Sequence, residues 1–94
     1  MMKNETTMEK NDLVKTIKEY FGRIEDISDF FLTLSGSSLG CVSAEGDRGY
    51  FFAHVDDYVD IIAPEIETHR SSGRKVLEFI DLADGVAGFA WRRR

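Results

Sequence analysis

The chain of 94 residues contains one cysteine, one proline and two histidines. A single cysteine excludes an internal disulfide framework, and so few sulfur and imidazole ligands disfavour a zinc site. No run of about 18 apolar residues could cross a membrane, and the first eleven residues lack the apolar centre of a signal peptide. We therefore expect a soluble, cytoplasmic protein that has no metal ion, no cofactor and no membrane partner.

The sequence also lacks a motif that carries chemistry, such as a phosphate-binding loop or an EF-hand. The nearest approach to a catalytic pair is Cys41 with His54, which the hairpin described below would make diagonal neighbours. Nucleophilic catalysis needs an activated thiolate, an orienting group and oxyanion donors, and nothing supplies those donors. We predict no catalytic residue, and an enzyme that uses Cys41 and His54 is only the third hypothesis.

What the chain does have is a regular apolar pattern between residues 12 and 36. The apolar residues recur at steps of four and three, at Leu13, Ile17, Tyr20, Ile24, Ile27, Phe31 and Leu34. This spacing places them on one face of a helix, so it predicts a long amphipathic helix that ends at Gly36. The alternative ends the helix at Phe21 and makes Phe30–Ser35 a strand.

The rest of the chain predicts two hairpins separated by a helical stretch. Residues 39–44 and 50–55 flank a turn-rich segment, and residues 74–82 and 86–91 flank another. Between the hairpins, Asp56 or Asp57 caps a helix that either bends at Pro64 or starts again there. The predicted fold is a small single α+β domain over residues 12–94. A long N-terminal amphipathic helix packs on an antiparallel sheet, the order is α-β-β-α-β-β, and residues 1–11 are flexible.

The first hairpin has two unequal faces. In the expected register Cys41 lies opposite Phe52, and Val42, Phe51 and their neighbours form a wholly apolar face. Such a face needs a dry partner, so we expect it to lie beneath the long helix. The other face carries Tyr50 and Phe52 and is then available as a contact surface.

Charge is unevenly distributed along the chain. The net charge is −5, and residues 41–69 hold seven acidic side chains and one basic side chain. This excess disfavours indiscriminate nucleic-acid binding. We expect instead a small acidic protein-binding module, an inhibitor or modulator of the immunity, antitoxin or phage- and plasmid-encoded types. Its contact residues for a partner, which could be basic, are Tyr50, Phe52, Asp56, Asp57 and Asp60.

Basic residues gather in the last quarter of the chain. If residues 74–82 and 86–92 pair, the second hairpin brings six of them towards one end of the sheet: Arg70, Arg74, Lys75, Arg92, Arg93 and Arg94. Arginine binds phosphate in a bidentate manner, so a nucleic-acid or phosphate site is the second hypothesis. The acidic segment and the basic tail of two copies could also meet, which makes a homo-oligomer a further hypothesis.

Overall fold

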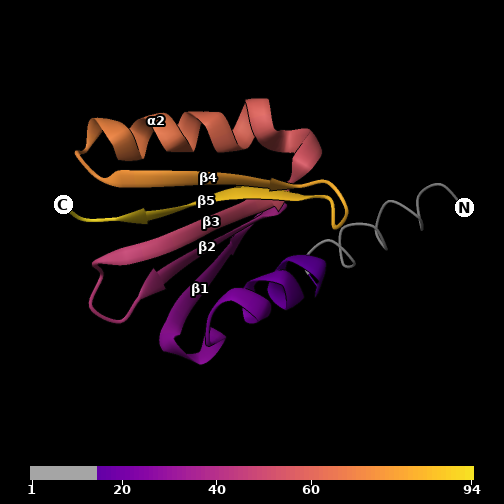
Figure 1. The fold of residues 1–94 in the computed structure, drawn as a ribbon, viewed down its shortest axis with the longest axis horizontal. Helices are drawn as coiled ribbons and strands as arrows, with labels where there is room; N and C mark the ends of the chain where they lie inside the picture. Colours follow the sequence, from indigo (N-terminus) through magenta and orange to yellow (C-terminus); the bar gives the residue numbers. More distant parts are fainter. Residues whose placement is uncertain (1–14) are drawn as a thin grey trace, which may run out of the picture.

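Five antiparallel strands form one sheet, with a helix on each face, in the part of the chain that the computed structural model describes, residues 15–94 (Figure 1). The strand order is β1-β2-β3-β5-β4. In chain order, a helix over residues 15–24 precedes η1 (Ile27–Asp29), β1 (Phe30–Ser35), β2 (Ser38–Ser43), β3 (Arg48–His54), η2 (Val55–Asp57), η3 (Tyr58–Ile62), α2 (Ala63–Ser71), β4 (Lys75–Asp81) and β5 (Val86–Arg92). These elements make a small, compact α+β domain. The predicted flexible segment, residues 1–11, lies outside the described residues.

The predicted helix over residues 12–36 is present over residues 15–24 and is wrong beyond residue 24, and its first three residues lie outside the described part of the chain. Asp26 has an extended backbone, and its carboxylate accepts a hydrogen bond from the amide of Ser28, which starts the 3-10 turn η1. The next residues, Phe30–Ser35, pair with β2 through a two-residue turn in which Gly36 has a φ of 61°. The alternative of a strand at this position is confirmed, and the order becomes α-β-β-β-α-β-β.

The β2–β3 hairpin is present, but its register differs from the predicted one by two residues. Cys41 lies opposite Tyr50, whereas the sequence predicted Phe52 at that position. The hydroxyl of Ser43 donates a 2.7 Å hydrogen bond to Asp47, which places the centre of the turn one residue earlier. Because side chains alternate with a period of two, this shift leaves every residue on its predicted face.

The two helices cover the faces of the hairpin in the reverse of the predicted arrangement. The N-terminal helix packs Ile17 and Phe21 against the face that carries Phe52. On the other face, Ile66 of α2 packs into a cluster that includes Phe89. The wholly apolar face of the hairpin therefore lies under the second helical stretch, and the N-terminal helix covers the face that carries Tyr50 and Phe52.

The second helical stretch changes character near its proline. It starts as η2 and the π-helical segment η3 and becomes α-helical at Ala63. Pro64 lies in the first turn of α2, where a missing N–H group breaks no helical hydrogen bond. The predicted restart of the helix is thus observed, and β4 and β5 then form the predicted hairpin. No helix among residues 15–94 is long and apolar enough to cross a membrane.

Candidate functional site

The face of the sheet that carries the N-terminal helix is only partly covered. At its uncovered end, the side chains that line the candidate site lie in two rows, each of which runs across neighbouring strands. Arg48, Arg92 and Lys75 lie directly opposite one another on β3, β5 and β4, and we call them the cation row. Two residues further along each strand, on the same face, Tyr50, Ala90 and Leu77 form a second row, which we call the notch row.

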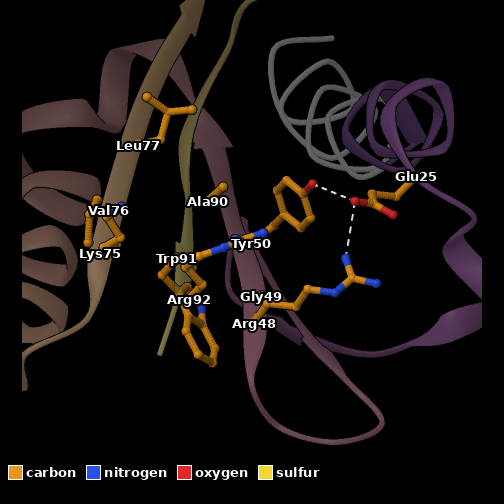
Figure 2. A pocket seen from close by; sticks show the side chains of 10 residues that line it. All are labelled: Glu25, Arg48, Gly49, Tyr50, Lys75, Val76, Leu77, Ala90, Trp91 and Arg92. Atoms are coloured by element: carbon orange, nitrogen blue, oxygen red, sulfur yellow. Dashed lines mark hydrogen bonds and ion pairs between the residues drawn. The ribbon is translucent and has the colours of Figure 1, made fainter. Parts of the chain in front are cut away.

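These two rows line a hollow of about 510 Å³ (Figure 2). Its floor includes Ala90, whose small side chain lies between the larger side chains of Tyr50 and Leu77. Leu77 is 73% exposed, so its side chain is open to contact by a ligand. The hollow, which we call the groove, therefore combines an apolar notch with a cationic border.

Glu25, the residue that directly follows the N-terminal helix, forms one wall of the groove. Its Oε2 atom accepts a 2.8 Å hydrogen bond from the hydroxyl of Tyr50 and a 3.2 Å hydrogen bond from Nη1 of Arg48, as Figure 2 shows. Burial raises the pKa of Tyr50 to about 12, and the hydrogen bond to Glu25 adds to the effect. The tyrosine thus remains a neutral donor, and Arg48 is the member of the cation row that already has a carboxylate partner.

The predicted arginine and lysine cluster is divided between the two faces of the sheet. Lys75 and Arg92 belong to the groove, but Arg70 forms an ion pair with Glu78 on the side of α2. Arg74 is also on that side, and its guanidinium lies 4.9 Å from the centre of the Trp91 ring. The prediction that all six cations converge is therefore wrong, because side chains alternate along β4 and β5.

Arg93 and Arg94 complete the predicted set at the end of the chain. The backbone N–H of Arg93 donates a 2.9 Å hydrogen bond to the carbonyl of Asp47 in the β2–β3 turn, and both arginines are exposed. Sequence reasoning missed Arg48 as a neighbour of these residues. The pairing of β3 with β5 brings it next to Arg92, and only a prediction of this pairing could have found it.

The predicted partner-binding residues do not form one surface. Phe52 is fully buried beneath the N-terminal helix, so its assignment as an exposed anchor is wrong. Tyr50 lies in the groove, whereas the acidic residues follow the opposite end of β3, whose last residue, His54, is four residues and about 13 Å from Tyr50. Within the acidic group, Asp56 and Asp60 are exposed, and Asp57 accepts a 3.3 Å hydrogen bond from the hydroxyl of Ser37.

The proposed pair of Cys41 and His54 is not formed. In the observed register Cys41 pairs with Tyr50, which places His54 four residues further along β3. The thiol is buried, and burial raises the pKa of Cys41 to about 12, so no thiolate is present at neutral pH. His54 instead accepts a 3.1 Å hydrogen bond from the amide of Asp56. Residues 15–94 contain no group of three or more potential ligands that could hold a metal ion.

A second surface, which sequence reasoning missed, is the free edge of β1. This strand pairs only with β2, so its other edge has no strand beside it within the described chain. Its sequence, FFLTLS, contains no charged residue, and Phe31, Leu32 and Leu34 are all exposed. Edge strands in soluble proteins are normally protected by charge, proline or a bulge. The apolar periodicity assigned these residues to a long helix, so it did not indicate an exposed strand edge.

Comparisons of this chain with protein-family models, with curated proteins and with solved structures found no match.

Proposed function

We propose that this chain is a small protein-binding module that acts as an inhibitor or modulator of a partner protein, and that the partner docks on the free edge of β1. One observation carries the proposal, namely an uncharged edge strand on which Phe31, Leu32 and Leu34 are exposed. A partner strand added to this edge would satisfy the unpaired backbone groups, and its side chains would cover the exposed apolar ones.

The chemistry of β1 supports a protein as the partner. A charged ligand would find no ion-pair partner on this strand, because it has no charged side chain. Exposed aromatic and aliphatic residues beside free hydrogen-bonding groups suit a segment that offers both, and an extended polypeptide does so. The opposite edge strand, β4, carries Lys75, Glu78 and Asp81, which protect it from strand addition in the usual way.

The experiment is a comparison of affinity captures with matched variants. Phe31→Lys places a charge on the edge at a side chain that is 66% exposed, so the fold should tolerate it. Leu82→Lys is the control, since Leu82 is 77% exposed in the β4–β5 turn, away from β1. Both variants are first shown to unfold at the wild-type temperature. Tagged protein then captures partners from a lysate of its source cells, and bound proteins are quantified by mass spectrometry.

We expect a specific protein that wild type and Leu82→Lys capture equally and that Phe31→Lys captures about tenfold less, which corresponds to about 1.4 kcal/mol. Equal losses in both variants would mean that any added charge weakens capture, and the proposal would fail. It would also fail if Phe31→Lys captured the same proteins as wild type at the same level, or if the wild-type chain captured none.

A further inference from the structure

The cation row is an unusual arrangement for an acidic protein. Directly opposed side chains in antiparallel strands have Cβ atoms about 4.5–5.5 Å apart, and like charges at that distance destabilise the sheet. Arg92 is the central member and has Arg48 and Lys75 opposite it on either side. Within residues 15–94, Glu25 pairs with Arg48, but neither Arg92 nor Lys75 has a carboxylate within 4.0 Å.

The notch row lies beside this charge at a defined distance. The two rows are two residues apart on each strand, which corresponds to about 6.7 Å along the strand direction. The notch above Ala90 is bordered by the ring of Tyr50 and by the exposed Leu77. The groove therefore presents a cationic position and an apolar position in series along the strands.

We propose that the groove binds an extended acidic segment of a partner protein, which places a carboxylate on the cation row and an apolar side chain in the notch. In an extended chain the side chains of residues i and i+2 point to the same side and are about 6.7 Å apart. A segment that runs along the strands, with an acidic residue at i and an apolar residue at i+2, therefore matches both positions. This inference rests on the proposed role in protein binding.

Charge and shape favour this occupant over other anions. A nucleic-acid backbone needs several cations along its path, and one that follows Arg48, Arg92 and Arg93 would also meet Asp47 and leave the apolar notch empty. A small inorganic anion would leave the notch empty and Leu77 exposed. A carboxylate next to an apolar side chain uses both positions, and a guanidinium such as that of Arg92 binds a carboxylate through two parallel hydrogen bonds.

The test uses the whole chain labelled with ¹⁵N and amide chemical shifts as the readout. The probe is the capped peptide acetyl-Thr-Glu-Thr-Leu-Thr-amide, which has glutamate and leucine at the required spacing. Three further probes are the same peptide with glutamine in place of glutamate, inorganic pyrophosphate, and a single-stranded DNA oligonucleotide. We expect the glutamate peptide alone to shift the amides of Lys75, Leu77, Ala90 and Arg92 in a saturable manner, at concentrations up to the millimolar range.

Arg92→Gln separates binding from folding, and Arg70→Gln is the matched control on the opposite face of the sheet. We expect Arg92→Gln to weaken peptide binding about tenfold and to leave the unfolding temperature unchanged or raised, because it relieves repulsion within the cation row. A role of Arg92 in folding alone would lower that temperature. Arg70→Gln should bind the peptide as wild type does.

Several results would overturn the inference. These are the absence of groove shifts at millimolar glutamate peptide, equal binding of the glutamine peptide, and binding of pyrophosphate or DNA at least as tight as that of the glutamate peptide. Phe31→Lys should leave peptide binding intact, because β1 does not contribute to the groove. If the peptide fails but capture that depends on Phe31 persists, the groove inference alone is wrong and the proposed function stands.

Discussion

The hydroxyl of Tyr50 donates a 2.8 Å hydrogen bond to Glu25, the residue that directly follows the N-terminal helix. The same carboxylate oxygen accepts from Arg48, so one side chain joins the end of the helix to two positions on β3. One turn earlier in the same helix, the ring of Phe21 packs against the rings of Tyr50 and Phe52, with centroid distances of 5.1 and 5.3 Å. Glu25 therefore stabilises the end of the helix over the sheet and borders the groove.

This relationship makes a prediction about stability. Tyr50→Phe keeps the ring and its packing but removes the donor to Glu25, so we expect a loss of about 1 kcal/mol in the free energy of unfolding, measured by urea denaturation. The control is Tyr58→Phe, whose hydroxyl bonds to Glu78 at an exposed site. It should change stability by less than about 0.5 kcal/mol. Equal losses in the free energy of unfolding for the two substitutions would show that the hydrogen bond to Glu25 does not stabilise the fold more than the exposed one to Glu78.

The part of the fold that the sequence predicted best is the part with short, well-marked hairpins. Turn residues near Gly46 and Gly85 marked the two hairpins, and the alternation of side chains assigned residues to faces correctly despite the shifted register. Which helix covers which face could not be predicted. Both faces of the first hairpin carry large apolar side chains, and the choice depends on contacts between residues far apart in the chain, such as Phe21 with Phe52.

The wrong prediction of a helix beyond residue 24 also has a physical cause. The steps of four and three that run through Ile24, Ile27, Phe31 and Leu34 fit a helix, but Phe31 and Leu34 are exposed on opposite faces of β1. Pairing with β2 across a tight turn outweighs the local helical pattern. The groove could not be predicted either. It depends on the pairing of β3 with β5 and on where the N-terminal helix ends, and both are set by contacts between residues far apart in the chain.

Two glycines offer opposite predictions about backbone packing. A Cβ atom at Gly22, on the exposed side of the N-terminal helix, would meet no atom within 4 Å, whereas one at Gly88 would overlap the carbonyl oxygen of Phe51. Gly22→Ala should therefore stabilise the fold by about 0.5–1 kcal/mol, because alanine has the higher helix propensity. Gly88→Ala should destabilise it by about 3 kcal/mol or more, because the central strands must separate.

Thermal and urea unfolding followed by circular dichroism measure both effects. For a domain of this size, a change of 1 kcal/mol moves the unfolding temperature by about 4–8 °C. The two variants should thus lie on either side of wild type. A stable Gly88→Ala protein would contradict the close approach of β3 and β5 at this position, and a destabilised Gly22→Ala protein would contradict a continuous helix through residue 22.

The pH dependence of stability should depend on His69. Its ring stacks on Trp91 and meets the edge of Phe89, and its Nδ1 atom lies 3.1 Å from Nη1 of Arg74. Burial, and secondarily the charge of Arg74, lower the pKa of His69 below its usual 6.5, and the carboxylate of Glu65, 3.9 Å from Nε2, opposes this only weakly. The folded protein therefore holds a neutral imidazole that accepts a hydrogen bond from Arg74.

The sign of the effect follows from the lowered pKa. As the pH falls through 6.5, the unfolded chain takes up a proton at His69 before the folded chain does, so the free energy of unfolding decreases until the lower pKa is reached. His69→Phe keeps an aromatic ring against Trp91 but cannot titrate, so urea denaturation between pH 7.5 and about pH 5 should show a smaller decrease than in wild type. Parallel curves for wild type and His69→Phe would show that His69 is not held neutral by this packing.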